Sequence, residues 1–169
     1  MDAMTAILTR RSIRSYIKKS ISEKIINDLL KAAVSSPSSG NQQPWHFIIL
    51  NNKDIFKKIA EFHPHAKFLV NAELAIVVCC DLNLEKFKGY WMIDCSTATL
   101  NILIAARALG LGSCWIGIYP REERINLLKK LLKTPDYVIP FSLVSLGYTN
   151  EEQNKIDRLD TCRIHKNYW

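Results

Sequence analysis

Residues 91–117 read WMIDCSTATLNILIAARALGLGSCWIG, and no other stretch constrains the fold as strongly. They overlap the most apolar part of the chain, Cys95–Tyr119, which two polar side chains and three glycines interrupt. These interruptions favour a buried helix followed by a strand over a membrane span. We expect the helix at about 92–109, ended by Gly110 as a left-handed cap residue, and the strand at 113–117.

Short helices and strands are expected on both sides of this stretch. Apolar periodicity and turn residues predict further helices at about 3–10, 52–62 and 120–132, and one capped by Ser20 or Ser22 that runs to about Ala33. They predict strands at 45–50, 74–80 and 138–146. Pro120 is expected to be the first residue of its helix, and Pro140 to place the last strand at an edge or a bulge. The chain has neither a Gly-x-Gly-x-x-Gly nor a Walker A motif, so we expect an α+β fold with a helical layer over a small sheet.

Composition and charge exclude several classes of protein. The 169 residues are 48% hydrophobic and 23% charged, which excludes a disordered tail, a collagen-like fibre and a disulfide mini-protein. The length suits a single domain, 1–169. The net charge is +7, and residues 1–34 alone contribute +4, with seven basic and three acidic side chains. A nucleic-acid binder spreads its cations along a whole face, so this concentration favours one compact anion site.

The cysteines and the N-terminus predict a cytoplasmic protein with no membrane partner. The first residues lack the basic and apolar regions of a signal peptide. Five cysteines form no Cys-x-x-Cys pair, and Cys79 and Cys80 are adjacent in an expected strand. We interpret them as small core side chains in a reducing compartment.

Two segments have the composition of a binding site. In Arg10-Arg-Ser-Ile-Arg14, three guanidiniums and a hydroxyl could hold a phosphate, although a solvated basic helix end would look the same. Ser36-Pro-Ser-Ser-Gly-Asn-Gln-Gln-Pro-Trp45 offers small side chains and amides that suit the polar edge of a planar heterocycle. An ordinary loop can have that composition too.

Together with further blocks in the same order, these segments resemble the nitroreductase family of FMN-dependent NAD(P)H oxidoreductases. The further blocks are Asp94–Leu103, Ala108–Gly117, Ser145–Tyr148, Asp157–His165 and the terminal Trp169. The resemblance therefore spans nearly the whole chain, which would be a short member of the family. It implies a nitroreductase-like fold: a small, mainly antiparallel sheet flanked by helices, with a long central helix, in an intertwined homodimer.

The resemblance also implies an FMN at each of two subunit interfaces, with the cofactor residues as follows. Arg10, Arg11, Ser12 and Arg14 match the first FMN block, with Arg10 facing the phosphate, Ser12 the phosphate or ribityl chain, and Arg14 the pyrimidine edge. Pro37, Ser38, Ser39, Asn41 and Gln43 match the loop that reaches the flavin from the other subunit. Trp115, Ile116 and Gly117 match the segment along the ring, where a backbone N–H approaches N5. Lys155 and Arg158 match the C-terminal cations on the phosphate.

The implied activity is hydride transfer from NADH or NADPH through flavin N5 to a small planar acceptor, such as a nitroaromatic or a quinone, in a ping-pong cycle. The flavin does the chemistry, so we expect no catalytic side chain. We expect no metal site either, and interpret His63-Pro-His65 as an exposed loop. Two alternatives stay open: a flavoenzyme for one metabolite, acting by reductive dehalogenation or flavin fragmentation, and a non-catalytic protein that stores or senses FMN.

Two segments are not explained by a single compact domain, namely 81–90 and the C-terminal tail. The segment 81–90 is short where larger family members carry an extra helical excursion over the flavin, so the residues that cover the cofactor are not evident. The polar tail from Asn150 ends in Tyr168-Trp169. Terminal aromatic side chains are costly to leave in water, so we expect the tail to dock, with a second subunit as one candidate surface.

Overall fold

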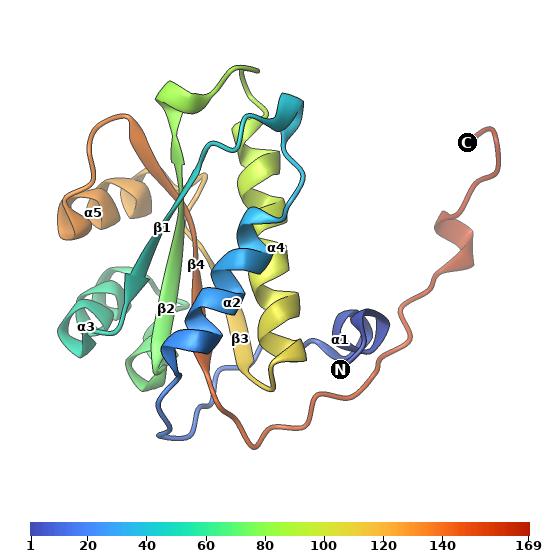
Figure 1. Cartoon of the computed structure of the whole chain (residues 1–169), viewed down its shortest axis with the longest axis horizontal. Helices are drawn as coiled ribbons and strands as arrows, with labels where there is room; N and C mark the ends of the chain where they lie inside the picture. The colour runs from blue at the N-terminus through green and yellow to red at the C-terminus, as the bar shows by residue number, and fades with distance from the viewer.

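A four-stranded antiparallel sheet forms the centre of the computed structural model, which describes all residues 1–169 (Figure 1). Its spatial order is β1-β2-β4-β3, so β3 is an edge strand. The strands are β1 (Trp45–Leu50), β2 (Leu74–Asp81), β3 (Gly112–Gly117) and β4 (Val138–Gly147). The expected antiparallel sheet is confirmed.

Helices cover both faces of this sheet rather than one. In Figure 1, α2 and α4 lie on one side of the strands, and α3 and α5 on the other. The helices are α1 (Ala3–Thr9), α2 (Glu23–Val34), α3 (Lys53–Phe62), α4 (Trp91–Ala108) and α5 (Glu122–Leu132), with single 3-10 turns at Ser39–Asn41, Lys67–Asn71, Leu82–Leu84 and Thr161–Arg163. None of the helices combines the length and apolarity that a membrane span needs.

The strand β2 explains why two helical layers are needed. Its alternate side chains enter different cores: Ile76 and Val78 pack towards α2 and α4, whereas Ala75 and Val77 pack towards α3 and α5. Because both faces of β2 are apolar, a single helical layer would leave one face in water. Cys79 and Cys80 follow the same alternation and lie in opposite cores, fully buried.

The end of α4 forms as its sequence predicts. Gly110 has φ +80°, and its N–H donates to the Arg107 carbonyl at 3.1 Å, while the Leu111 N–H donates to the Ala106 carbonyl at 2.8 Å. This paired arrangement is the Schellman motif that a glycine after a helix permits. The motif turns the chain directly into β3, so the glycine at position 110 determines both where α4 ends and where β3 begins.

One proline prediction needs correction, and the other is met by one of its two alternatives. The helix α5 begins at Glu122 and not at Pro120, because a turn closed by the Arg121 N–H on the Ile118 carbonyl (3.1 Å) comes first. Pro140 lies in β4, an interior strand, so of the two alternatives the edge does not apply. The predicted bulge is present, since the register between β2 and β4 shifts at Val78/Cys79 opposite Pro140.

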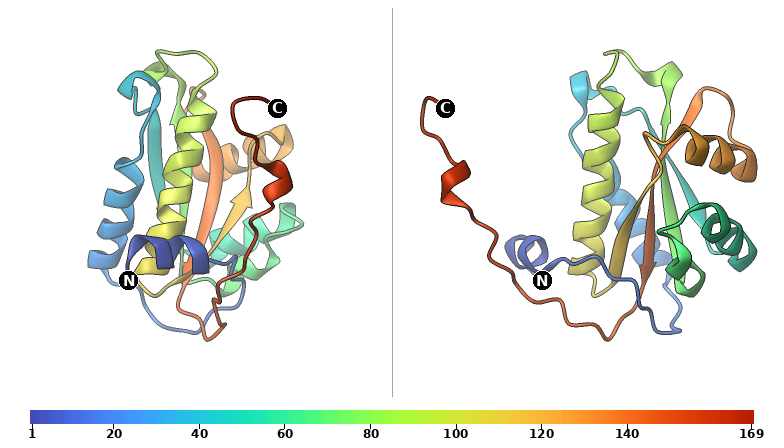
Figure 2. Two further views of the ribbon diagram at one scale, coloured as in Figure 1. Left: turned by 90° about the vertical axis from the view of Figure 1, so that its right-hand side faces the viewer. Right: turned by 180° about the vertical axis from the view of Figure 1, so that it is seen from behind.

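After its first residues, which Arg11 and Arg107 hold through the Asn154 and Gln153 carbonyls, the C-terminal tail leaves the domain. Figure 2 shows the segment after β4 passing below α1 and then rising alongside α4, separated from it by open space. Its apolar side chains are among the most exposed in the molecule: Leu159 is 74%, Tyr168 86% and Trp169 fully exposed. Within one copy of the chain, the expected docking of this tail is therefore not present.

Candidate cofactor site

The two ends of the chain meet in a cavity of about 470 Å³ whose lining includes four cations. Arg10 and Arg11 follow α1, and Lys155 and Arg158 come from the tail that runs beneath it (Figure 2). The tail is tied down by backbone acceptors: Arg11 Nη2 donates to the Asn154 carbonyl. The structure thus brings together four of the predicted cofactor residues from positions more than 140 apart in the sequence.

The positive charge in this cavity is not neutralised by the chain. Partial desolvation, and then repulsion from Arg158, Arg10 and Arg107, lower the pKa of Arg11. None of these four guanidiniums forms an ion pair with a carboxylate. The one acidic residue at the cavity, Asp157, accepts a hydrogen bond from the Leu159 N–H (3.0 Å). Crowded guanidiniums that form no ion pair suit a bound dianion.

A second cavity, of about 530 Å³, contains the other half of the N-terminal block. Arg14 lines it together with Trp115, Ile116 and Gly117, and its lining includes no Asp or Glu. A parallel bridge between Ser12 and Ser113 holds residues 10–14 against β3. Five consecutive residues therefore place Arg10 at one cavity and Arg14 at the next, with the exposed residue Ser12 between them.

The free edge of β3 faces this second cavity. The Ile13 N–H donates to the Ser113 carbonyl at 2.9 Å on the side away from β4. Since backbone polar groups alternate along an antiparallel strand, Trp115 and Gly117 present their N–H and C=O groups to that same open side. Beyond the bridge at Ser113, the edge is left without a strand partner.

Gly117 has no structural reason to be glycine within this chain. Its φ is not positive, and a Cβ built on it would meet no atom within 4 Å. By contrast, a Cβ on Gly112 would lie 2.7 Å from Ile13 Cγ2. A glycine that neither backbone conformation nor packing requires is expected where a ligand approaches the backbone closely.

The loop 36–43 is held by a buried carboxylate at the start of α4. Asp94 is 2% exposed, and it accepts hydrogen bonds from the Ser39 N–H (2.9 Å), the Ser39 hydroxyl (3.2 Å) and Gln42 Nε2 (2.6 Å). The loop is irregular as expected, apart from its single 3-10 turn. Gly40, Asn41 and Gln43 have φ values of +52°, +55° and +47°.

This loop lies far from the cations in the same copy. Asp94 holds the loop at the first turn of α4, whereas Arg107, in the last turn, donates to Thr9 Oγ1 (2.8 Å) just before Arg10. Thirteen residues of helix separate them, which is roughly 20 Å along the axis. Figure 1 shows the two regions at opposite ends of α4. Of the predicted residues, Pro37, Ser38, Ser39, Asn41 and Gln43 are thus not brought to the two cavities.

Comparison with known proteins decides the family. The model described as "Nitroreductase family" matches residues 7–66 and 63–148. The chain belongs to the nitroreductase family. A relative from Methanothermobacter thermautotrophicus, named "Putative NADH dehydrogenase/NAD(P)H nitroreductase", is 46% identical over 100% of this chain and 88% of its own. A crystal structure of a Parabacteroides distasonis protein with that same name has 34% identity and TM-score 0.94, covering 99% and 98% of the two chains. An "FMN-dependent Nitroreductase" structure from Clostridium difficile has 31% identity and TM-score 0.89, covering 98% and 100%.

The structure of this nitroreductase family member adds site residues that the sequence alone did not single out. Lys67, His63, His65 and Arg124 line the second cavity, and Arg107 adjoins the first. The prediction that His63 lies in an exposed loop is wrong: His63 is 1% exposed, because the Gly117 carbonyl gives its ring a buried partner at 2.9 Å. No sequence signal indicates that contact. Asp94 could have been found, since a carboxylate among the apolar residues of the first helical turn needs buried donors.

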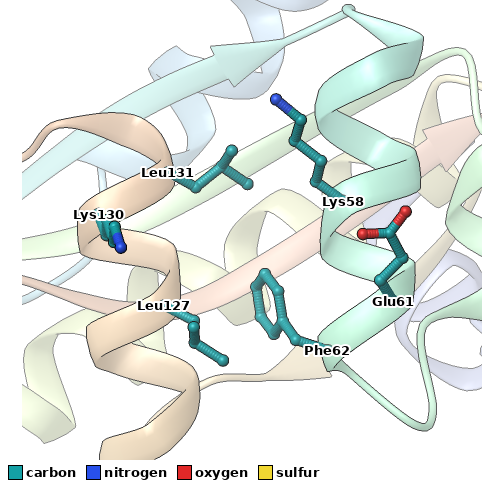
Figure 3. A pocket seen from close by; sticks show the side chains of 6 residues that line it. All are labelled: Lys58, Glu61, Phe62, Leu127, Lys130 and Leu131. Carbon is teal, nitrogen blue, oxygen red and sulfur yellow. The ribbon is translucent and has the colours of Figure 1, made fainter.

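A further cavity, of about 600 Å³, lies elsewhere. It opens between α3 and α5, where Phe62, Leu127 and Leu131 form an apolar floor between Lys58 and Lys130 (Figure 3). It includes none of the predicted cofactor residues and no free backbone edge. We therefore place the candidate cofactor site in the two smaller cavities that residues 10–14 connect.

Proposed function

We propose that the protein is an FMN-dependent oxidoreductase that passes a hydride from NADH or NADPH to a flat acceptor such as a nitroaromatic or a quinone. The observation that carries this proposal is the pair of cation-rich cavities joined by residues 10–14. It is supported by the 31% identical relative named as FMN-dependent and by the 46% identical relative named as an NAD(P)H nitroreductase.

The first cavity fits the phosphate of FMN. A phosphate monoester is a dianion near neutral pH, and charge-assisted hydrogen bonds from guanidiniums are the strongest that side chains offer it. Arg10, Arg11 and Arg158 have no carboxylate partner, and Lys155 lies beside them. We assign the phosphate to these four cations, with the Ser12 hydroxyl between the phosphate and the ribityl chain.

The second cavity fits the isoalloxazine ring. The open edge of β3 offers backbone N–H groups at Trp115 and Gly117, with Ile116 between them, and Gly117 leaves room for close approach. Reduced FMN carries negative charge over its pyrimidine ring, which Arg14 and Lys67 would stabilise in this acid-free cavity. We therefore assign the ring to this cavity, with its pyrimidine edge towards Arg14.

The chain's own residues would bind and orient the cofactor rather than exchange protons or form covalent bonds. When bound, FMN supplies hydride transfer at N5. The fixed cations hold its phosphate and favour its reduced anion, and the β3 edge fixes the ring plane. The nicotinamide and the acceptor would occupy the same place in turn, as a ping-pong cycle requires.

We infer that the complete site needs a second copy of the chain. The loop 36–43 cannot reach the cations beside its own α1, because it lies at the other end of α4. In addition, α4 is apolar on its outer side, where Ile93 is 58% and Leu100 45% exposed. Exposed apolar side chains that line up along a helix are normally covered by another surface. A partner packed on α4 would cover this stripe and bring its own loop 36–43 to the cavities.

The tail fits the same assembly. It carries exposed Leu159, Ile164, Tyr168 and Trp169, and it runs beside α4 across an open space (Figure 2). The tail would then wrap around a partner lying in that space. This contact would bury the aromatic end of the tail and make an intertwined homodimer. We also assign the protein to the cytoplasm, since its five cysteines are all free and four of them are buried.

The test is an anaerobic titration of the purified holoprotein with NADH and with NADPH. We expect a yellow protein whose flavin absorbance bleaches with at least one donor and returns when a quinone or nitroaromatic is added. A yellow protein that neither nicotinamide reduces would contradict the proposal and favour FMN storage or another electron donor. Return of colour with only one class of metabolite would favour a specialised flavoenzyme.

A further inference from the structure

Two side chains that line the second cavity meet on a single atom. His63, which follows α3, has its Nε2 2.9 Å from the carbonyl oxygen of Gly117. Arg124, in α5, donates from Nη1 to the same oxygen, also at 2.9 Å. A carbonyl oxygen has two lone pairs, so these two donors satisfy it completely.

The surroundings of His63 fix which of its nitrogens carries the proton. The backbone N–H of His65 donates to Nδ1 at 3.3 Å, so the proton of the neutral ring must be on Nε2, which donates to Gly117. Burial lowers the pKa of His63 below its usual 6.5, and the positive charge of Arg124 acts in the same direction. The ring is therefore neutral at pH 7 and is committed as a donor to Gly117.

The oxygen held in this way belongs to the residue that should lie nearest the ring. Gly117 presents its carbonyl and its N–H to the same open side of β3. A free carbonyl there would direct its negative end into the cavity, and without a side chain Gly117 could turn its peptide units readily. The two donors hold the Gly117 carbonyl in place, so its peptide unit does not turn. They also compensate the negative charge that the carbonyl would otherwise direct into the cavity.

We propose that His63 and Arg124 are positioning residues for the flavin, which act through the Gly117 carbonyl to hold the β3 edge towards the ring and to shield the reduced cofactor from that carbonyl's negative charge. The inference rests on the proposed function, because it requires FMN in the second cavity. It adds to that function a pair of residues whose effect falls mainly on the reduced, anionic form of the cofactor. The oxidised ring is neutral and should depend on them less.

The test compares His63→Phe, which keeps a ring but no donor, with His63→Gln, whose side-chain amide can still donate to Gly117. We expect His63→Phe to weaken binding of reduced FMN about tenfold relative to oxidised FMN, which lowers the two-electron midpoint potential by about 30 mV. In His63→Gln the midpoint should stay at the wild-type value. The readouts are the midpoint potential of bound FMN, the fluorescence titration of apoprotein with oxidised FMN, and the thermal unfolding of the apoprotein.

Arg124→Met is the second variant, with Arg121→Met as its matched control. Both changes remove one cation from the start of α5, but Arg121 is exposed and makes no contact with Gly117. We expect the midpoint to fall in Arg124→Met and to stay unchanged in Arg121→Met. If His63→Phe does not fold, the midpoint potentials of Arg124→Met and Arg121→Met still test whether the donors to Gly117 matter.

Two results would overturn this inference and leave the proposed function intact. One is an unmoved midpoint potential in FMN-loaded Arg124→Met, and the other is a midpoint shift in Arg121→Met equal to that in Arg124→Met. A midpoint that falls equally in His63→Gln and His63→Phe would also count against it, since the donor would then not matter. A wild-type chain that binds no FMN would overturn the proposed function as well. That result is read first, on the wild type, so the two failures are distinguishable.

Discussion

Single side chains at the ends of the chain determine how tightly the proposed phosphate is held. We expect Arg10→Ala and Arg158→Ala each to weaken FMN binding by about 1.5–3 kcal/mol, the usual contribution of a hydrogen bond to a charged group. Fluorescence titration of the apoprotein with FMN measures the change. Arg121→Ala, which removes an exposed cation outside that cavity, serves as the control. Unchanged affinity in both test variants would contradict the assignment of the phosphate.

Substitution of Gly117 should weaken FMN binding without lowering the stability of the apoprotein. A Cβ there meets no atom of the chain, so Gly117→Ala should leave the free energy of unfolding unchanged or raise it by up to about 1 kcal/mol. FMN affinity should fall about tenfold, or 1.4 kcal/mol, because the methyl group would occupy the approach of the ring. Gly112→Ala should instead destabilise the apoprotein through its clash with Ile13. FMN binding that is as tight as in the wild type would show that the ring lies elsewhere.

The contribution of His63 to the free energy of unfolding depends on pH, and the direction of that dependence follows from the burial of its ring. Its pKa in the folded chain is below 6.5, so the unfolded chain binds its proton more readily. The contribution of His63 to stability is therefore complete above about pH 6.5 and is lost as the pH falls through the folded pKa. Urea unfolding across this range should show a shallower acid loss in His63→Gln than in the wild type. Equal slopes would contradict the buried, neutral ring.

At the scale of elements, the loop 36–43 depends on α4 through Asp94. Asp94→Asn replaces an acceptor by an amide donor facing Gln42 Nε2. We expect the free energy of unfolding to fall by about 1–3 kcal/mol, with faster proteolysis in the loop. Asp28→Asn, which removes an exposed pair with Lys31 (3.5 Å), should cost no more than about 1 kcal/mol. A loop that stays resistant in Asp94→Asn would mean that other contacts hold it.

The elements that local signals specify were predicted well from the sequence, and those that depend on distant contacts were not. Gly110 ends α4 as expected, because a left-handed cap is a property of the few residues around it. The start of α5 was placed two residues early, since the turn onto Ile118 cannot be read from Pro120 alone. His63 was placed in solvent, because its partner lies 54 residues away. Likewise, only the family resemblance indicated that Arg10 and Arg158 share a site.

At the scale of the whole molecule, one copy of the chain holds two separated halves of the proposed site. The cations lie where the two termini meet, and the loop 36–43 lies at the far end of α4 (Figure 1). The apolar outer side of α4 and the exposed tail both lack a covering surface. A single arrangement, in which two copies pack on α4 and exchange tails, would account for all of these features.

Mixing two defective variants tests this arrangement most directly. One variant carries Arg10→Ala and Arg158→Ala, and the other carries Asn41→Trp, at an exposed position whose side chain is bonded only to Gln43 of its own loop. Each variant alone should bind FMN weakly. If a site takes its cations from one copy and its loop from the other, a mixed dimer has both defects in one site and none in the other. We predict that unfolding and refolding the two variants together restores tight FMN binding at one site per mixed dimer. Mixed dimers that still bind FMN weakly would contradict a site shared between two copies.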